Sequence, residues 1–229
     1  MVLLAALAVD EAPNPWFSWS FVRDNSDAIL AALRQHVTLT LESVALAVLV
    51  AFPLALLARR FRRLATPIIG LSGVLYTIPS LALLAFLEPF VGLNQNTVLI
   101  GMVLYALVIL VRNFLVGLQG VPDEVREAAR GMGYGSARML WRVELPIALP
   151  AMMAGVRIAT VSTIALITVG VLVGNGGLGQ LIFEGFNNNF YRAEIVTGSA
   201  LCVALALVAD GLLAVLTRLL APWNVRASR

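Results

Sequence analysis

The stretch Glu127–Pro146, EAARGMGYGSARMLWRVELP, places charged residues and glycines in the middle of a chain that is mostly apolar. The sequence has 229 residues, of which 60% are hydrophobic and only 13% are charged, and its mean hydropathy is +0.90. An average soluble domain has about 45–50% apolar and about 25% charged residues. The composition therefore predicts a protein that crosses a membrane several times, with the polar stretch outside the hydrocarbon.

The scarce residue types exclude several kinds of site. With one cysteine, Cys202, and one histidine, His36, a single copy cannot form an internal disulfide or a paired-histidine metal site. We interpret Cys202 as a core residue and His36 as a helix-start residue. All sixteen basic residues are arginine, whereas a P-loop needs a lysine that reaches the phosphates. The glycine-rich GNGGLGQ at 174–180 is therefore not expected to bind a nucleotide, and no enzymatic activity, metal or cofactor is expected in this chain.

The apolar runs predict an all-α fold. A helix that crosses the ~30 Å hydrocarbon layer needs about 20 apolar residues. Because the runs meet this length and the charges gather between them, we predict a polytopic bundle of about five spans. The predicted spans are 37–58, 64–87, 97–118, 148–172 and 195–220.

The arginines orient the predicted spans. RRFRR at 59–63 and the connection 119–147 carry four arginines each, whereas 88–96 has none and 173–194 has only Arg192. Connections rich in arginine stay in the cytoplasm. The N-terminus is thus predicted outside the cell, and the C-terminus and the connection 119–147 in the cytoplasm.

Three parts follow from this orientation: an external N-terminal segment 1–36, a transmembrane domain 37–220 and a cytoplasmic tail 221–229. The first part carries aromatic residues that suit the membrane interface. It also contains Ser26, which is expected to cap a short surface helix. The interfacial aromatic residues are Trp16, Phe17, Trp19 and Phe21.

Helix start and stop signals divide the connection 119–147. Pro122 suits the first position of a helix, and the acidic residues Asp123 and Glu124 suit its first turn. The glycines that follow are expected to end this helix and to allow a sharp turn. Apolar spacing predicts one stripe of Val125, Ala128, Ala129 and Met132, and a second short helix at 136–143 before Leu145–Pro146 and the fourth span.

Two interpretations of this helical pair remain open from physics alone. It is either a solvated loop beside the membrane or a docking element for a cytoplasmic partner. The spacing resembles the EAA loop of bacterial ABC importer permeases: EAA, three residues, Gly, nine residues, an aliphatic residue, one residue and Leu-Pro. The matching residues are Glu127, Ala128, Ala129, Gly133, Val143, Leu145 and Pro146.

Further segments resemble the osmoprotectant branch of these permeases, which imports glycine betaine, choline and carnitine. They are IPSLALLAFL at 78–87, VRNFLVGL at 111–118, VELPIALPAMMAGVRIAT at 143–160 and GNGGLGQLIFEGF at 174–186. The resemblance implies the type I ABC importer transmembrane fold in the bacterial cytoplasmic membrane. A methionine-type permease has the same loop and stays open as an alternative. A self-sufficient channel or secondary transporter is a third interpretation, although no internal repeat supports it.

The resemblance also implies the partners. A cytoplasmic ABC ATPase would bind ATP and Mg²⁺ and receive the loop, an external binding protein would deliver the solute, and a second permease, identical or similar, would complete the pathway. None of these partners is a nucleic acid. Residues 174–190, with their glycines and three successive asparagines, are expected to form a re-entrant or surface turn near the external gate, where the binding protein would dock, or else a plain connecting loop.

Polar residues within the spans give two further sets of candidates. Charges there are rare and need partners, so they mark either a solute path or structural pairs, for which Asp210 with Arg112 is one combination. A quaternary ammonium solute favours aromatic faces and dipoles, although threonines in spans also bond to their own helix. The charges are Glu42, Arg112, Arg157 and Asp210, and the path candidates are Tyr76, Pro79, Ser80, Thr160, Thr163 and Thr168.

Overall fold

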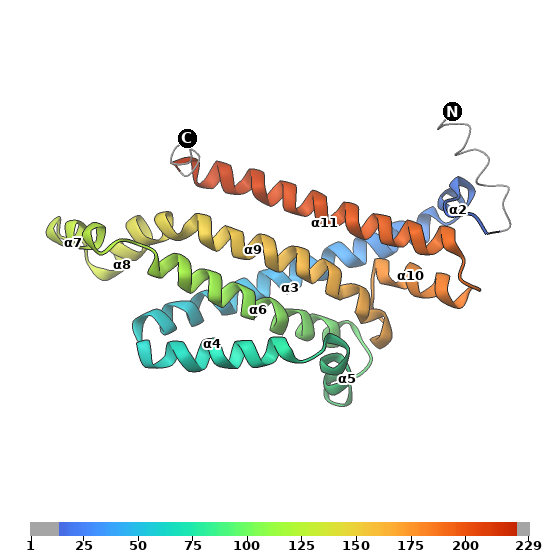
Figure 1. The fold of residues 1–229 in the computed structure, drawn as a ribbon, viewed down its shortest axis with the longest axis horizontal. Helices are drawn as coiled ribbons and strands as arrows, with labels where there is room; N and C mark the ends of the chain where they lie inside the picture. The colour runs from blue at the N-terminus through green and yellow to red at the C-terminus, as the bar shows by residue number, and fades with distance from the viewer. Residues whose placement is uncertain (1–13, 224–229) are drawn as a thin grey trace. The chain divides into compact units, whose positions relative to one another are not determined.

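The computed structural model describes residues 14–223, apart from the side chains of residues 62, 65, 69, 72, 75 and 76. In this range the chain is helical and has no strand, which confirms the predicted all-α class (Figure 1). The first helices are α2 (Trp19–Asp24), α3 (Ser26–Arg60), α4 (Arg62–Thr77), α5 (Ser80–Val91) and α6 (Gln95–Gln119). They are followed by α7 (Asp123–Gly131), α8 (Ser136–Met139), α9 (Leu145–Ile167), α10 (Leu178–Asn187) and α11 (Arg192–Leu220).

Four helices of the described chain are long and apolar enough to cross a membrane: Ser26–Arg60, Gln95–Gln119, Ser136–Val173 and Arg192–Leu220. They contain four of the five predicted spans. The predicted span 64–87 is wrong as a single helix, because the chain leaves the helical conformation at Ile78–Pro79 and splits it into α4 and α5. A residue before proline avoids the helical region, and Pro79 itself is extended at φ −57° and ψ 136°.

Two predicted helix boundaries also differ from the structure. The short helix expected at Ser26 is the beginning of α3, so residues 26–36 continue into the first span. The helix expected at 136–143 likewise runs into α9 without a break, through a π-helical segment at Leu140–Glu144. That segment directly precedes Pro146, which has no N–H to donate to the preceding turn.

The described chain forms two compact units. Unit 1 comprises residues up to Ser43, Pro79–Met102 and Ser162–Val208, and unit 2 comprises Val44–Ile78, Val103–Val161 and the chain from Ala209. Unit 2 has its core among α3, α6 and α9. Small residues let these helices approach closely: Ala47, Ala51, Ala55 and Ala58 of α3 are buried against Ala106, Leu110 and Phe114 of α6 and Ala148 and Met152 of α9.

Unit 1 is organised around a buried histidine. The ring of His36 accepts a hydrogen bond at Nδ1 from the Leu178 N–H (3.2 Å) and donates from Nε2 to the Ile164 carbonyl (3.0 Å). His36 is fully buried. The prediction of a helix-start residue is wrong, because α3 already begins at Ser26. His36 ties α3 to α9 and to the first turn of α10.

The glycine-rich segment before α10 fits closely against its neighbours. Gly174 and Gly177 adopt positive φ angles of 87° and 52°. A Cβ at Gly177 would lie 2.7 Å from the Cβ of His36. The predicted surface turn at 174–190 is correct only for its glycines, because most of the segment is the helix α10.

Replacing Gly179 should destabilise the fold. A Cβ there would lie 2.4 Å from the Thr168 carbonyl oxygen, a backbone atom that cannot move aside easily. We expect Gly179→Ala to lower the free energy of unfolding by about 1–3 kcal/mol, as overpacking usually does. The measurement is the thermal unfolding midpoint of the detergent-purified chain. Gly211→Ala is the control, since nothing lies within 4 Å of its added Cβ, and an equal midpoint for both variants would contradict the prediction.

Candidate functional site

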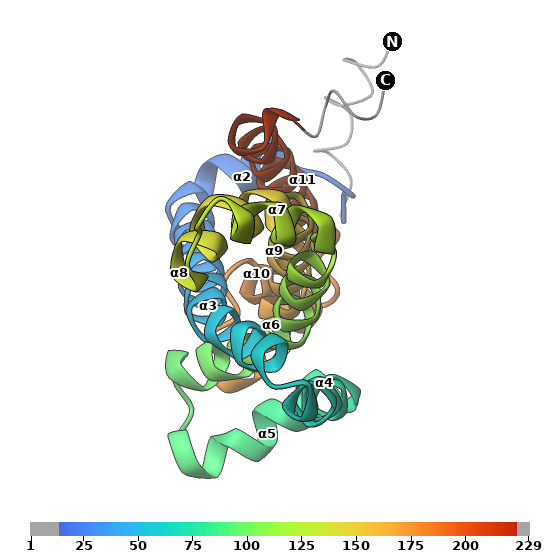
Figure 2. The same ribbon diagram turned by 90° about the vertical axis from the view of Figure 1, so that its left-hand side faces the viewer.

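The chain between α6 and α9 forms the two short helices α7 and α8, which lie together in unit 2. Figure 2 looks onto this end of the unit, with α7 and α8 nearest the viewer. Helix α7 begins at Asp123, with Pro122 as its N-cap residue one position before the predicted place. Asp123 and Glu124 lie in its first turn and Arg130 in its last, so each charge interacts favourably with the helix dipole.

One glycine creates the turn between the two helices. Gly133 has a φ of 80°, a left-handed conformation that favours glycine. The N–H of Gly133 bonds to the Arg130 carbonyl (2.9 Å), and the N–H of Tyr134 bonds to the Ala129 carbonyl (3.0 Å). This pair of bonds is the Schellman pattern of helix ends. Of the three glycines predicted to act here, Gly133 is therefore the one whose backbone requires glycine.

The EAA residues divide between two faces of α7. Ala129 is only 1% exposed, whereas Glu127 and Ala128 are exposed. Met132 is 69% exposed, so the predicted apolar stripe is buried only at Ala129 and in part at Val125. The exposed face of α7 thus carries Met132 and Ala128 beside the carboxylate of Glu127. Leu145 and Pro146 begin α9, and both are half-buried.

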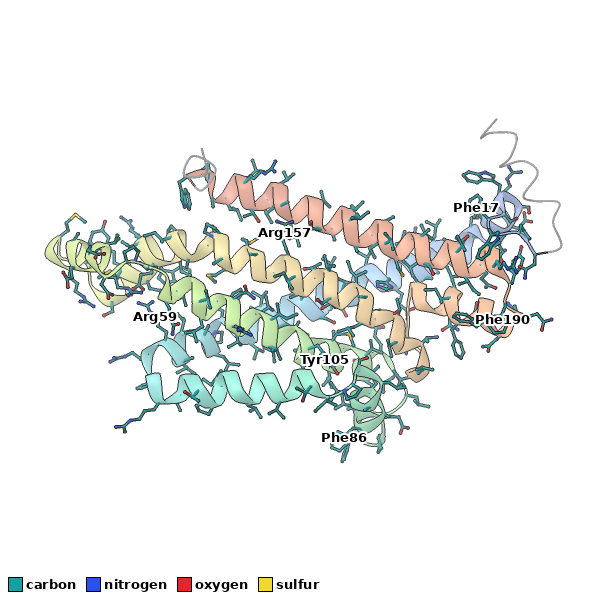
Figure 3. The ribbon with its side chains drawn as sticks, viewed as in Figure 1. Phe17, Arg59, Phe86, Tyr105, Arg157 and Phe190 are labelled. Carbon is teal, nitrogen blue, oxygen red and sulfur yellow. The ribbon has the colours of Figure 1, made fainter. Side chains whose placement is uncertain are left out.

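A buried carboxylate lies below this surface. Glu144 is 3% exposed, and both of its oxygens accept hydrogen bonds from the guanidinium of Arg59 at the end of α3. Its Oε1 also accepts from Arg126 Nε of α7 at 3.1 Å. We call these three residues the Arg59–Glu144–Arg126 cluster. Arg59, at the end of α3, is labelled in Figure 3.

Arg126 uses all of its nitrogen atoms within unit 2. Besides Glu144, it donates from Nη1 to Asp123 Oδ1 (2.7 Å) and from Nη2 to the Leu118 carbonyl of α6 (2.9 Å). One side chain thus joins α6, α7 and the segment that leads into α9. None of the sequence patterns predicted this cluster. The available signal was Glu144 itself, an acid between two apolar residues just before a predicted span.

A cavity opens beside the cluster. It has a volume of about 650 Å³ and is lined by apolar residues of α3 and α8 together with three arginines, Arg59, Arg60 and Arg130. Arg59 is neutralised by Glu144. Arg60 and Arg130 are exposed and have no acidic partner among the described residues. The cavity is therefore positively charged.

The four intramembrane charges have three different surroundings: two of them form a pair, one is exposed and one lies in a groove. Arg157 and Asp210 form a two-pronged pair at 2.8 and 2.7 Å between α9 and α11 (Figure 3). Asp210 thus pairs with Arg157, and the combination with Arg112 is wrong. Glu42 is exposed on α3 and has no partner among the described residues. Of the two interpretations of the intramembrane charges, a solute path or structural pairs, this contact agrees with a structural pair of Arg157 and Asp210.

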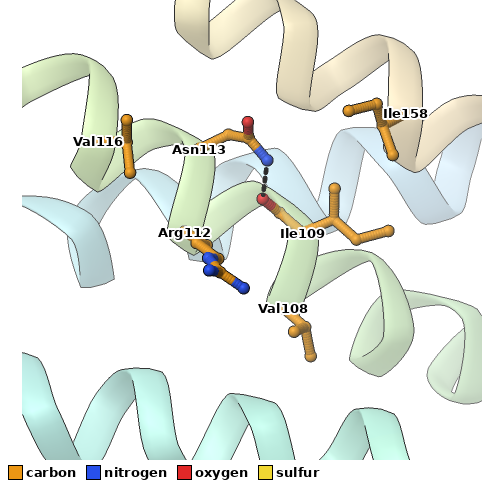
Figure 4. Close-up of a pocket in the computed structure, with 6 residues that line it drawn as sticks. All are labelled: Val108, Ile109, Arg112, Asn113, Val116 and Ile158. Carbon is orange, nitrogen blue, oxygen red and sulfur yellow. Dashed lines mark hydrogen bonds between the residues drawn. The ribbon is translucent and has the colours of Figure 1, made fainter.

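Arg112 lies in a groove of unit 2. The groove has a volume of about 380 Å³ and is lined by Val108, Ile109, Arg112, Asn113, Val116 and Ile158 (Figure 4). Asn113 donates to the Ile109 carbonyl at 2.7 Å, and its Cβ lies 2.5 Å from where a Cβ of Gly155 would be. Gly155 therefore makes room for Asn113 between α6 and α9.

The six path candidates do not form one cluster within either unit. Tyr76 and Thr160 belong to unit 2, and the other four belong to unit 1. The side chain of Tyr76 lies outside the described part of the chain. Thr160 and Thr168 donate to carbonyls of their own helical turns, those of Val156 and Ala165. Pro79 and Ser80 mark the start of α5, and Thr163 is buried.

The architecture is that of a polytopic membrane protein in which a polar helical pair, α7 and α8, connects the spans α6 and α9 at one end of unit 2. A family model described as binding-protein-dependent transport system inner membrane component matches residues 37–225. The chain belongs to this family. It is therefore a multi-pass protein of the bacterial cytoplasmic membrane.

Curated relatives cover nearly the whole chain. The carnitine transport permease protein OpuCB of Listeria monocytogenes is 37% identical over 211 residues, which are 92% of this chain and 96% of the relative. The choline transport system permease protein OpuBB of Bacillus subtilis (strain 168) is 37% identical over 90% of this chain and 94% of its own length. The osmoprotectant import permease protein OsmW of Salmonella typhimurium is 34% identical over 90% and 98%.

Solved structures share the fold. The MetNI methionine ABC transporter in an inward-facing conformation has a TM-score of 0.74 at 20% identity, over 84% of this chain and 95% of that chain. An amino acid ABC transporter crystallised with histidines has a TM-score of 0.71 at 17% identity, over 88% and 98%. The fold implied by the EAA resemblance, that of an ABC importer transmembrane domain, is thereby confirmed.

Removing the buried carboxylate should destabilise unit 2. Glu144→Ala leaves Arg59 and Arg126 without the acid that both contact, and breaking a buried pair costs about 3–5 kcal/mol. We expect a clear drop in the unfolding midpoint and in the yield of folded protein from membranes. The control is Glu127→Ala, which removes an exposed carboxylate from the same loop. Equal midpoints for both variants would refute the buried role of Glu144.

The pair in the spans can be tested by a double substitution. Asp210→Leu should lower the amount of inserted protein, because it leaves Arg157 without its acidic partner and an unpaired charge in a span disfavours insertion. Arg157→Leu combined with Asp210→Leu should restore insertion. The measurement is the fraction of chain in the membrane that resists carbonate extraction. If the double variant inserts no better than Asp210→Leu, the pair of Arg157 and Asp210 does not contribute to membrane insertion.

Proposed function

We propose that this chain is the membrane-spanning permease subunit of an ATP-driven importer of osmoprotectants such as glycine betaine, choline or carnitine. The observation that carries the proposal is the solute class of the relatives. Eight of them, 33–37% identical over 88–92% of this chain, are named as permeases for carnitine, choline, glycine betaine or osmoprotectants. The likeness to a methionine transporter is at 20% identity and concerns the fold, which hosts many solutes.

The partners of the proposed importer are separate chains. A cytoplasmic ATPase would bind ATP and Mg²⁺ and receive the exposed face of α7. The family description names a binding protein, which would deliver the solute from outside. Two different permeases of Bacillus subtilis, OpuCB and OpuCD, carry the same three solutes in their names. This supports a second permease subunit, identical or similar, beside the present chain.

The orientation belongs to the same proposal. The arginines of the segment 59–63 and of the loop 119–147 favour a cytoplasmic position for α7 and α8. The N-terminal segment would then be external, where Trp16 and Trp19, both more than half exposed, suit the membrane interface. The number of about five spans stays part of the proposal, beside the four helices of the described chain that are long and apolar enough to cross a membrane. The solute-path residues and the cytoplasmic position of the tail 221–229 remain part of the proposal. Residues 1–13 and 224–229 lie outside the part of the chain that the structure describes.

Docking by α7 can be tested with two substitutions. Glu127→Lys reverses the exposed charge of the proposed contact, and Gly133→Val places a β-branched residue at a φ of 80°, which strains the turn by about 1–3 kcal/mol. In a mild-detergent pull-down with equal permease yield, we expect the amount of ATPase recovered with each variant to be at least tenfold lower than with the unchanged chain. ATP-driven uptake of labelled glycine betaine or choline should fall with it.

The control is Gly131→Ala, since a Cβ there meets nothing within 4 Å and its φ is not positive. Full ATPase retention and full uptake in both test variants would show that α7 is not the docking element. Uptake by the chain alone in liposomes without ATP would instead favour a channel or a secondary transporter.

A further inference from the structure

Helix α7 has little apolar contact with the unit that it belongs to. Only Ala129 of this nine-residue helix is fully buried. The residues that would meet an ATPase, Glu127 and Ala128, face away from the unit and are exposed. A force applied at this surface therefore has to pass into the spans through something other than a packed apolar core.

The Arg59–Glu144–Arg126 cluster provides that connection. Arg126 on α7 contacts Glu144, and Glu144 contacts Arg59 in the last turn of α3. Arg126 also contacts the Leu118 carbonyl near the end of α6. The donors of the planar guanidinium form a fixed fork, so its hydrogen bonds fix the orientation of the partner group as well as its distance.

We propose that Arg126 is the positioning residue that makes α7 move together with the end of α3, by way of Glu144. The inference rests on the proposed docking of an ATPase on α7. In this mechanism the cluster stays closed while the ATPase moves α7, so that α7, the Glu144 segment and the Arg59 turn shift as one body.

The contacts of Glu144 distinguish a positioning role of Arg126 from a purely structural role. Glu144 receives two hydrogen bonds from Arg59 alone, so its buried charge is compensated without Arg126. Arg126 is itself 16% exposed at its side chain. Removing Arg126 therefore leaves the buried pair intact and detaches α7 from it.

The test uses the complete importer in proteoliposomes: this chain, its ATPase and its binding protein. The substitution is Arg126→Gln, and the readout is the number of labelled solute molecules taken up per ATP hydrolysed. We expect ATPase retention to stay within twofold of the unchanged chain, and uptake per ATP to fall about tenfold, as coupling residues can change coupling by that order. Arg126→Lys, which keeps the charge but not the fork, should give an intermediate ratio.

Two further variants complete the set. Arg142→Gln is the matched control, because Arg142 is an exposed arginine of the same loop with no partner among the described residues, and its ratio should be unchanged. Arg59→Gln cuts the other side of Glu144 and should also lower the ratio in the assembled importer. A purely structural role for Arg126 would reduce the amount of assembled complex and leave uptake per ATP unchanged.

The outcomes distinguish this inference from the docking proposal. Loss of ATPase retention in Glu127→Lys together with an unchanged ratio in Arg126→Gln would overturn the inference and keep the docking. If the unchanged chain retained no ATPase, the docking proposal itself would fail. A lowered ratio in Arg126→Gln, with Arg142→Gln unaffected, supports the inference.

Discussion

The burial of the Glu144 carboxylate constrains how unit 2 is closed at its α7–α8 end. A charge removed from water needs opposite charges and hydrogen bonds to compensate the lost hydration. One partner comes from α3, 85 residues away in the chain, and the other from α7, 18 residues away. The end of α3, the helix α7 and the segment before α9 must therefore meet at one place. Arginine suits this arrangement, since one fork binds both carboxylate oxygens and another bridges three acceptors.

Much of the fold could be predicted from local patterns. Apolar length located four of the spans, since a helix in lipid must satisfy its own backbone hydrogen bonds and its side chains must be apolar. The glycine turn and the acidic first turn of α7 could also be predicted, because both depend on residues close in the chain. The break at Ile78–Pro79 had a local signal too. A proline alone does not predict such a break, because prolines also occur inside spans, as Pro53 of α3 does.

The candidate site could be predicted only in part, because its remaining contacts join distant segments. Nothing near Arg157 in the sequence indicates Asp210, which lies 53 residues further on. The two hydrogen bonds of His36 reach residues 128 and 142 positions away. The EAA spacing located α7 but gave no information about Arg126, whose proposed importance comes from what its guanidinium contacts. Spacing reports which side of a helix a residue lies on, and tertiary structure decides what it meets there.

Helix α7 has a further consequence for the assembly of a complex. An isolated helix shorter than about 12 residues is marginal in water, and α7 has nine. Here both ends are fixed within the chain itself: Arg126 and the acidic first turn at one end, and the Gly133 turn at the other. The proposed docking surface is therefore preorganised before any partner arrives. Binding then loses little conformational entropy at α7, so that more of the contact energy appears as affinity.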